Sequence, residues 1–553
     1  MCGIITLFGK NIKDIDLDRL LKLIVHRGPD DSSTYEDVYS KIGFVRLGIM
    51  DILKGNQPFI NDNLVLVANG EIYNYKKLKH DNFNDSELNG FKSESDCEII
   101  LHLYNKYGFD FMNKVNIQGM FAFVIYDRLR KEIIVGRDFM GIIPLYRGYD
   151  KLGNVYFSSE IKAINHCSNI DIYKPGSISK YSEGIEMESY NYYNEKWFSI
   201  EGYMPNYRIN SDIRFSELRG KFIEAVESHM MSDVKYGVLL SGGLDSSLVA
   251  AIVKRKMVRD KAKNNLATFS IGLKGSPDIE SAEKVAKYLG TNHYSFIYSI
   301  EDGLSAIREV INHTETYDTT TIRASTPMYL LSRKIKALGY KMVLSGEGAD
   351  EMFGGYLYFH KAPNSIEFQK ELVLKMKKLH YYDNLRANKS MLAWGIESRV
   401  PFQDRDMIDY TMNIDPNDKM CSNKIQKYIL RKAFDTEEDQ YLPKEILWRQ
   451  KEQFSDGVGY GWIDSLKKLG ESKVTDYQMS LVEKIYPKNT PNTKEEFLYR
   501  DIFESIFSKV AVGVVNFEKS IACSTSSALK WEKLKNQTYD PSGLCIDTHI
   551  NKI

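Results

Sequence analysis

The second residue of the chain is a cysteine, and its position suggests chemistry more than its type does. Initiator methionine is normally removed before a small residue, so we expect a mature chain that begins with Cys2 and carries a thiol and a free α-amine on one residue. An α-amine with a pKa of about 7.7–8.0 can accept the thiol proton near neutral pH. Alternatively, Cys2 is a small apolar residue at the start of a strand, and position two alone does not decide.

A second candidate site is VLLSGGLDSS, residues 238–247, where an apolar strand is expected to end in a Ser-Gly-Gly turn. A helix is expected to begin at Asp245, Ser246 and Ser247. Glycines let a ligand approach the backbone closely, and a helix N-terminus offers N–H groups and a favourable dipole to an anion. Phosphate is the expected ligand, although the Gly-Lys-Ser/Thr of a Walker A loop is absent.

A matching acidic loop follows another expected strand at LSGEGADEMFGGY, residues 344–356. It carries Glu347, Asp350 and Glu351 among four glycines. Ligands of open α/β sheets bind at the carboxyl ends of strands, so both loops are expected to face one crevice. Asp245 and Asp350 are then placed to hold Mg²⁺ together with phosphate oxygens and water. The alternative is an acidic turn exposed to solvent.

The elements that position these residues divide the chain into parts. Up to about residue 195, short apolar runs rich in Ile, Val and Phe are separated by turns, which is typical of stacked antiparallel sheets. DLDRLLKLIVHRG and ESDCEIILHLYNKYG have helical spacing and are expected to cover those sheets. We predict an N-terminal α+β sandwich over residues 1–195, followed by a polar, tyrosine-rich linker over 196–212.

After the linker, strand and helix patterns alternate through KYGVLLSGG, SSLVAAIVKRK, NLATFSIGL and IESAEKVAKYLG. This alternation predicts an α/β domain with a parallel sheet and extra helices over residues 213–515. The last residues, 516–553, are polar and weakly periodic, so we expect a loosely ordered tail.

Composition excludes several classes of function. The chain has 74 basic and 74 acidic side chains, so its zero net charge argues against a nucleic-acid or membrane surface as the main partner. It has no apolar run long enough for a transmembrane helix and no secretory signal, so a cytoplasmic protein is expected. Six cysteines without CxxC spacing predict neither a disulfide framework nor a zinc site.

Many motifs together resemble the glutamine-hydrolysing asparagine synthetases of the bacterial B type, from Cys2 to about residue 462. They are MCGI, HRGPD, RLGIMD, NGEIYN, SDCE, GMFAF, GRDFMGIIPLY, LLSGGLDSS, SIG, ETYDTTTIRASTPMY, SGEGADEMFGGY and ESRVPF. The resemblance implies an N-terminal nucleophile (Ntn) hydrolase-like glutaminase joined to an ATP pyrophosphatase (PP-loop) synthetase. It implies glutamine, aspartate and ATP as substrates, Mg²⁺ as a cofactor, and a homodimer as the assembly to test.

By this resemblance, Cys2 attacks the side-chain amide of glutamine, a glutamyl thioester forms as ammonia leaves, and water releases glutamate. Asn69 and the backbone N–H of Gly70 are implied to stabilise the oxyanion, and Arg46 to bind the substrate α-carboxylate. The other residues implied to contact glutamine are Leu47, Gly48, Ile49, Met50, Glu71 and Asp96, the last two through its α-amine. The chain departs from the usual pattern at Gly48, commonly Ser or Ala, and in the Phe-Val pair before Arg46, commonly polar.

In the synthetase the resemblance implies that the aspartate β-carboxylate attacks the α-phosphorus of ATP, giving β-aspartyl-AMP and pyrophosphate, and that ammonia then displaces AMP. Glu347 is implied in forming the intermediate and in ammonia attack, and Lys427 in neutralising pyrophosphate. The residues implied to bind ATP are Leu240, Ser241, Gly242, Gly243, Asp245, Ser246, Ile271, Ser345, Gly346 and Lys427, with Mg²⁺ on Asp245 and Asp350. Ala349 replaces a common Ser, and Gln403 replaces a common Leu near the expected aspartate end.

Ammonia is mostly protonated at neutral pH and would escape to solvent, so a dry route between the sites is expected. GMFAFVIYD (119–127) and GRDFMGIIPLY (136–146) are candidates to line it, although either is equally well explained as sheet core. Two rivals remain: a related PP-loop amidotransferase or cyclase that adenylates another carboxylate, and a non-catalytic regulatory protein that kept the fold.

Overall fold

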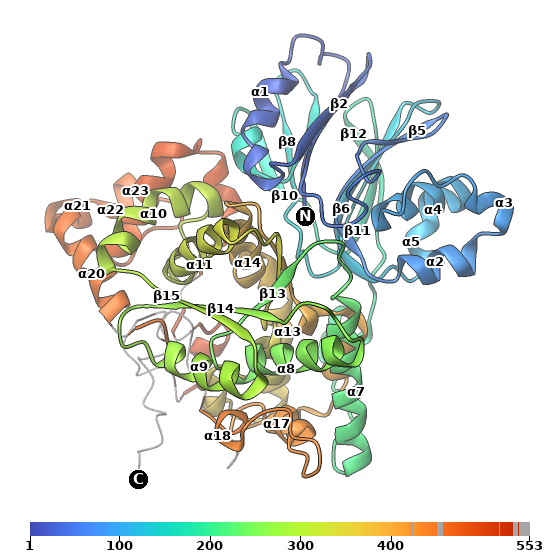
Figure 1. The fold of residues 1–553 in the computed structure, drawn as a ribbon. Coiled ribbons are helices and arrows are strands. Elements are labelled where there is room, and N and C mark those ends of the chain that lie inside the picture. Colours follow the sequence, from blue (N-terminus) through green and yellow to red (C-terminus); the bar gives the residue numbers. More distant parts are fainter. Residues whose placement is uncertain are drawn as a thin grey trace.

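The computed structural model describes residues 1–421, 425–450, 457–459, 461–518, 520–521, 523–532, 534 and 540. A strand-rich N-terminal part lies beside a larger, helix-rich C-terminal part (Figure 1). Within the described residues, no helix has both the length and the apolar character needed to cross a membrane.

Two six-stranded antiparallel sheets form the N-terminal part. The first contains, in spatial order, β10 (Asn169–Ile172), β8 (Tyr146–Tyr149), β9 (Val155–Ser158), β1 (Gly3–Phe8), β3 (Ser40–Arg46) and β2 (Asp31–Glu36). The second contains β12 (Ile185–Asn191), β11 (Ser177–Ser182), β7 (Glu132–Arg137), β6 (Gly119–Asp127), β5 (Leu64–Ile72) and β4 (Phe59–Ile60). Ile4 of β1 and Val67 of β5 belong to one buried apolar cluster, which confirms the predicted sandwich.

Helices flank this sandwich on both sides, as the two helical patterns predicted (Figure 1). On the side of the first sheet lies α1 (Leu17–Lys22), which begins after Asp16, whose side chain accepts a hydrogen bond from Arg19 N. Beside the second sheet lie α2 (Tyr75–Asn82), α3 (Asp85–Leu88), α4 (Ile99–Tyr107) and α5 (Phe111–Lys114).

The C-terminal part is built on a five-stranded parallel sheet. Its spatial order is β15 (Asn292–Ile297), β14 (Ala267–Gly272), β13 (Tyr236–Leu239), β16 (Met342–Leu344) and β17 (Glu397–Arg399). The chain runs outward from β13 to β15 and then returns to β16 on the other side of β13. The crevice beyond the carboxyl ends of β13 and β16 is therefore a topological switch point, where such sheets bind ligands. The predicted parallel sheet is confirmed.

Helices cover both faces of the parallel sheet (Figure 1). One face carries α8 (Leu244–Arg259) and α9 (Pro277–Leu289), with α7 (Asp212–Ser228) against α8, and the other carries α10 (Ile300–Thr314), α11 (Thr319–Ala337) and α14 (Asp383–Leu392). The remaining helices are α12 (Ala349–Phe353), α13 (Ser365–Lys378), α15 (Arg405–Met412), α16 (Pro416–Lys419), α17 (Tyr428–Phe434), α18 (Lys444–Leu447), α20 (Gly461–Lys473), α21 (Asp476–Ser480), α22 (Val482–Ile485) and α23 (Lys494–Ile506).

The segment expected to be a linker is attached to the second domain. It begins with α6 (Lys196–Ser199), in which Trp197 is buried. The indole N–H of Trp197 donates a hydrogen bond to Asp409 Oδ1 of α15 at 3.0 Å. The aromatic residues of this polar stretch thus pack against a neighbouring helix.

Described residues of the segment predicted as a tail, 516–553, pack against the rest of the chain. Four of its apolar side chains are buried, those of Ile521, Ala528, Trp531 and Leu534. The backbone N–H of Thr525 also donates to buried Glu371 at 2.9 Å. These apolar residues have no helical or strand period, so pattern analysis gave no signal for their packing. Residues 535–539 and 541–553 lie outside the described part of the chain.

Candidate active sites

The first candidate site surrounds Cys2, which immediately precedes β1. The backbone N–H of Cys2 donates to Asn69 Oδ1 at 2.7 Å, and its Sγ lies 3.9 Å from the carbonyl oxygen of Leu47. Arg27 Nε donates to the Cys2 carbonyl at 3.0 Å. Burial raises the pKa of the Cys2 thiol. A thiol with a raised pKa needs a base to take its proton. The backbone nitrogen of Cys2, which is bonded to Asn69, would become a free α-amine after removal of Met1 and could act as that base.

Asn69 and Gly70 lie on β5, in the sheet opposite Cys2. Gly70 has a φ of 146°, and a Cβ added there would lie 2.0 Å from the carbonyl oxygen of Met120. No side chain fits between β5 and β6 at this point, so glycine is required. The structure places both residues implied in oxyanion stabilisation beside the nucleophile.

Arg46 ends β3, directly across from Cys2, since Gly3 pairs with Val45 in the register of β1 and β3. Its guanidinium donates to the carbonyl oxygens of Ile52 at 3.0 Å and Asp51 at 2.6 Å. Both acceptors are neutral, so the guanidinium charge remains available to a substrate carboxylate.

Asp96 and Glu71 are both buried near this site. Asp96 Oδ2 accepts a hydrogen bond from Ile72 N at 2.5 Å, and burial raises the pKa of Asp96 to about 6. Burial also raises the pKa of Glu71, although the Arg399 guanidinium 3.0 Å away acts in the opposite direction. Arg399 comes from β17 of the other domain, a partner that the sequence did not reveal.

We expect the mature enzyme to begin with Cys2 and to carry a free amine. In the full-length chain Met1 is 1% exposed, and its ammonium contacts the Glu397 carboxylate. A retained methionine would leave the Cys2 nitrogen in a peptide bond, where it cannot accept a proton. Intact mass measurement and N-terminal sequencing check this, and Met1 retained in fully active enzyme would contradict it.

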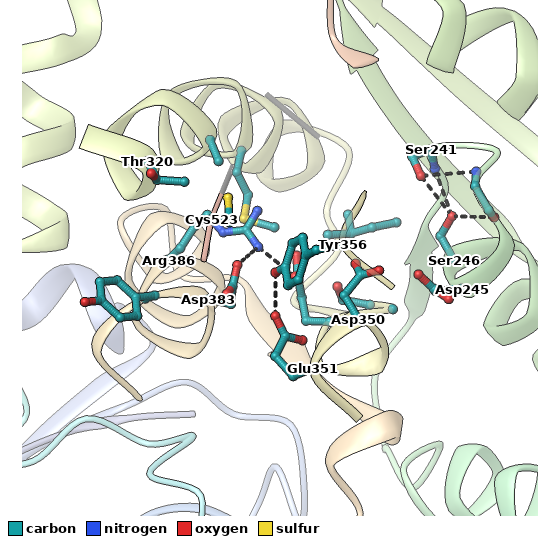
Figure 2. A pocket seen from close by; sticks show the side chains of 18 of the residues that line it. Ser241, Asp245, Ser246, Thr320, Asp350, Glu351, Tyr356, Asp383, Arg386 and Cys523 are labelled. Carbon is teal, nitrogen blue, oxygen red and sulfur yellow. Dashed lines mark hydrogen bonds and ion pairs between the residues drawn. The ribbon is translucent and has the colours of Figure 1, made fainter. Parts of the chain in front are cut away.

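The second candidate site is a cavity of about 220 Å³ at the switch point of the parallel sheet (Figure 2). Of the residues expected to bind ATP or act on it, those that line the cavity are Leu240, Ser241, Gly243, Asp245, Ser246, Ile271, Ser345, Gly346, Glu347, Asp350 and Lys427. Gly242 does not line it. At Gly242 φ is 72°, and an added Cβ would lie 2.4 Å from Ala282 N. A glycine is therefore required at position 242, because the loop packs closely against α9.

The Ser-Gly-Gly loop is held by its own hydroxyl groups. Ser246 Oγ accepts a hydrogen bond from Ser241 N at 3.2 Å, and Ser241 Oγ accepts one from Gly243 N at 3.3 Å (Figure 2). Gly243, the N-cap of α8, has no side chain to cap the helix. The first N–H groups of this 16-residue helix are thus open to an anion in the cavity.

Two carboxylates and one lysine meet beside this loop. Lys427 Nζ lies 2.5 Å from Asp245 Oδ2 and 2.6 Å from Asp350 Oδ1. The two carboxylates, 105 positions apart in sequence, therefore converge on one point, as the sequence predicted. Lys427 is itself 2% exposed and lines the cavity, where its ammonium can meet the negative charge of a ligand.

Glu347 lies in the cavity, but it is paired with a cation that sequence reasoning missed. Arg386 of α14 donates to Glu347 Oε2 and to Asp383 Oδ1, each at 2.7 Å. The loop that carries Glu347, residues 344–356, contains no arginine or lysine, and the partner comes from a helix 39 residues later in the chain. Figure 2 shows Arg386 and Asp383 on one side of the cavity, across from Ser241 and Ser246.

Comparison with known proteins shows which family the chain belongs to. Residues 1–189 match the glutamine amidotransferase domain family, and residues 217–368 and 363–531 match the asparagine synthase family. Asparagine synthetase B (glutamine-hydrolyzing) of Escherichia coli (strain K12) is 46% identical over 99% of this chain and 99% of its own length. Asparagine synthetase (glutamine-hydrolyzing) 2 of Oryza sativa subsp. japonica is 48% identical over 98% of this chain and 92% of its own length. The chain belongs to the glutamine-hydrolysing asparagine synthetases.

The synthetase cavity includes residues that sequence reasoning did not assign. Among them are Thr320, Tyr356, Lys375, Asp383, Arg386 and Cys523. A signal existed for Thr320, which lies within the motif ETYDTTTIRASTPMY. Arg386 and Asp383 belong to the helical stretch DNLRANKS, which gave no functional signal, and Cys523 belongs to the supposed tail.

A buried ionic network joins the N-terminal glutaminase domain to the C-terminal synthetase domain. Arg27 Nη1 lies 2.6 Å from Glu160, and Lys389 Nζ of α14 lies 3.4 Å from the same carboxylate and also contacts Glu315. Glu315 in turn accepts a hydrogen bond from Ile161 N at 2.6 Å. Removing one partner of such a network would leave a buried charge uncompensated. The network therefore fixes α14 relative to the glutaminase domain.

Proposed function

We propose that this protein makes L-asparagine from L-aspartate and ATP, with ammonia that it releases from L-glutamine. The observation that supports this best is that one chain carries both Cys2, whose backbone N–H is bonded to Asn69, and a cavity at the switch point of the parallel sheet lined by Glu347 and Asp350. Full-length similarity to glutamine-hydrolysing asparagine synthetases supports the pairing of the two chemistries. Incubation with glutamine, aspartate and ATP, followed by assay of asparagine, glutamate, AMP and pyrophosphate, tests the proposal.

In the glutaminase site, the α-amine of Cys2 takes the thiol proton and the thiolate attacks the side-chain carbonyl of glutamine. A C–S bond forms, and the oxyanion is held by the Asn69 amide and the Gly70 N–H. Collapse of this intermediate breaks the C–N bond, and the amine returns a proton to the leaving ammonia. Water then cleaves the thioester and releases glutamate. Arg46 and Asp96 hold the substrate α-carboxylate and α-amine.

In the synthetase site, a β-carboxylate oxygen of aspartate attacks the α-phosphorus of ATP, and the bond to the bridging oxygen of pyrophosphate breaks. The Ser241–Ser247 loop, the N-terminus of α8 and Lys427 bind the phosphates. The lone pair of ammonia next forms a C–N bond with the activated carbonyl, and the bond to AMP breaks. Glu347 accepts the proton that the new amide nitrogen loses.

Mg²⁺ belongs to this proposal. Asp245 Oδ1 is buried without a hydrogen-bond partner, and Asp245 and Asp350 already converge on one cation, Lys427. Carboxylate and phosphate oxygens are the ligands that Mg²⁺ prefers. Among the described residues no group of three or more His, Cys, Asp or Glu side chains is arranged to hold a metal, so phosphate oxygens and water would complete its shell. When bound, Mg²⁺ would neutralise phosphate charge.

The same proposal assigns residues 1–195 to the glutaminase, 196–212 to the linker and 213–515 to the synthetase, although described residues beyond 515 also line the cavity. We place the enzyme in the cytoplasm, where its substrates are available. A homodimer is the assembly to test, and light scattering of the purified full-length chain would measure it.

We expect AMP and pyrophosphate as the nucleotide products, each in equal yield with asparagine. Attack at the α-phosphorus is the reaction expected of a PP-loop site, and Lys427 and the N-terminus of α8 would then stabilise the negative charge of the pyrophosphate that leaves. Chromatography of the nucleotides and an assay for pyrophosphate check this. Stoichiometric ADP and phosphate would contradict it and favour another mode of activation.

A further inference from the structure

Part of the wall of the synthetase cavity comes from residues beyond 515, for which the sequence predicted no role. It consists of the described residues 516–518, 520–521 and 523–525, which we call the C-terminal segment. The members of this segment that line the cavity are Glu518, Ser520, Cys523, Ser524 and Thr525. Figure 2 places Cys523 on the side of Arg386, away from Ser241 and Ser246. Because the Ser-Gly-Gly loop is the expected phosphate site, the segment lies at the end left for aspartate.

The C-terminal segment is anchored on α13 by buried polar contacts. The backbone N–H and the side-chain hydroxyl of Thr525 donate to the two carboxylate oxygens of Glu371, at 2.9 and 2.6 Å. Glu371 is 1% exposed and also accepts a hydrogen bond from the Tyr358 hydroxyl at 2.7 Å. A buried carboxylate that loses a donor is left incompletely solvated, at a cost in free energy. The pairing of Thr525 with Glu371 therefore fixes the position of the segment.

The segment also orients Lys375, which lies one turn after Glu371 on α13. Lys375 Nζ donates to the carbonyl oxygen of Cys523 at 3.0 Å and lies 4.9 Å from the centre of the Tyr356 ring. Cys523 has a φ of 65°, a left-handed conformation that is uncommon for residues other than glycine. Such a conformation persists only where the surrounding contacts enforce it. The turn at Cys523 is thus a built feature that presents its carbonyl to the lysine.

Lys375 carries a positive charge that a ligand in the cavity can meet. Its hydrogen-bond acceptor is a neutral carbonyl, and its side chain lines the cavity. Burial acts to lower the pKa of Lys375, but the carboxylates of Glu351 and Asp383 act more strongly together, and the pKa lies above its ordinary value. The side chain is therefore an ammonium at neutral pH.

Aspartate needs such a cation, because it has an α-carboxylate in addition to the β-carboxylate that reacts. Three cations line this end of the cavity, namely Lys375, Lys378 and Arg386. Arg386 is paired with Glu347 at 2.7 Å, and Lys378 is paired with Glu518 of the C-terminal segment. Of these three, Lys375 is the one held by a neutral acceptor, so its charge is the one best placed to bind a carboxylate.

We propose that the C-terminal segment completes the aspartate pocket, where the Cys523 carbonyl holds the Lys375 ammonium in position to bind the α-carboxylate of aspartate. This inference rests on the proposed function. Cys523 and Thr525 are positioning residues, since they act on the substrate through Lys375. Loosening the segment should therefore weaken aspartate binding and leave nucleotide binding and the glutaminase reaction as they are.

Thr525→Val in the full-length enzyme tests the proposal, because valine keeps the shape and the backbone N–H but removes the hydroxyl that binds Glu371. With ammonium chloride as nitrogen source, we expect the KM for aspartate to rise about tenfold, the scale of one hydrogen bond to a charged group. The kcat, the KM for ATP and glutaminase turnover should stay unchanged. Thr525→Ser retains the hydroxyl and should keep the wild-type KM for aspartate.

Thr314→Val is the matched control. It removes a buried threonine hydroxyl that donates to the carbonyl oxygen of Val310 at 2.7 Å, in α10 and outside the residues that line the cavity. It should leave the KM for aspartate unchanged.

The Cys523 thiol gives a second readout that does not require turnover, since this residue is half-buried and lines the cavity. Its labelling by N-ethylmaleimide is followed by peptide mass spectrometry, with α,β-methylene-ATP present throughout so that aspartate is not consumed. Aspartate at about ten times its Kd should slow labelling at Cys523 about tenfold, because only the unoccupied fraction reacts. Labelling at Cys2, in the glutaminase domain, should not respond to aspartate.

An unchanged KM for aspartate in Thr525→Val would overturn the inference, and so would labelling of Cys523 that aspartate does not slow in enzyme that makes asparagine. A parallel rise in the KM for ATP would also overturn it, because it would indicate a general structural role. Wild-type enzyme that forms no asparagine from aspartate, ATP and ammonium chloride would instead refute the proposed function.

Discussion

Cys2→Ala is expected to abolish glutamine-dependent asparagine formation while the ammonia-dependent reaction continues at close to the wild-type rate. The Cys2 thiol is the group assigned to form the acyl bond with glutamine, so its removal should stop the release of ammonia. The synthetase cavity is lined by residues of β13, β14, α8, α11 and α14 and of the loops that follow β13 and β16, and none of its lining residues falls within residues 1–195. Alanine also keeps a small residue at position two, so methionine removal should be unaffected.

The measurement is asparagine formed per enzyme with either glutamine or ammonium chloride, and glutamate formed in parallel. Cys167→Ala is a matched control, because burial raises the pKa of this thiol to about 12 and makes it inert. It should keep both activities. If the Cys2 variant lost the ammonia-dependent reaction as well, while remaining folded, the two sites could not be as independent as the structure indicates.

The residues near both reaction centres could be predicted from the sequence because they lie in contiguous motifs at strand ends. MCGI leads into the buried strand β1, and NGEIYN and LLSGGLDSS each combine the end of a buried strand with the turn that follows it. In all three, the residues with a candidate role lie in the same short motif as the strand that positions them. The convergence of Asp245 and Asp350 also followed from sequence, since both come directly after strands of one parallel sheet.

Contacts that depend on the packing of distant helices could not be predicted. Arg386 approaches Glu347 only because α14 packs on the sheet, and Arg399 reaches Glu71 only because the two domains meet at β17. Neither Arg386 nor Arg399 lies in the same sequence motif as the carboxylate that it binds. The segment around Cys523 was read as a tail because its buried residues have no period, although tertiary packing orders them.

Glu347→Gln is expected to lower asparagine synthesis by roughly 10²-fold or more, the scale of a lost general base. Glutamine keeps the size of the side chain and can still accept the hydrogen bond from Arg386, which also remains paired with Asp383 at 2.7 Å. The cavity should thus keep its shape. What is lost is the negative charge and the ability to take a proton from the attacking nitrogen, so the defect should appear in kcat for both nitrogen sources.

In this variant glutaminase turnover at Cys2 should continue and release ammonia that is not used, so the ratio of glutamate to asparagine is the most sensitive readout. Glu495→Gln makes the same chemical change at a buried carboxylate bonded to Arg323 at 2.9 and 2.7 Å, outside the residues that line the cavity, and should retain synthesis. Equal losses in both variants would mean that buried charge, and not catalysis, is what Glu347 contributes. A wild-type yield of asparagine from Glu347→Gln would place the proton acceptor elsewhere. Because Arg386 donates a hydrogen bond to Glu347, that result would leave the pair with a positioning role only.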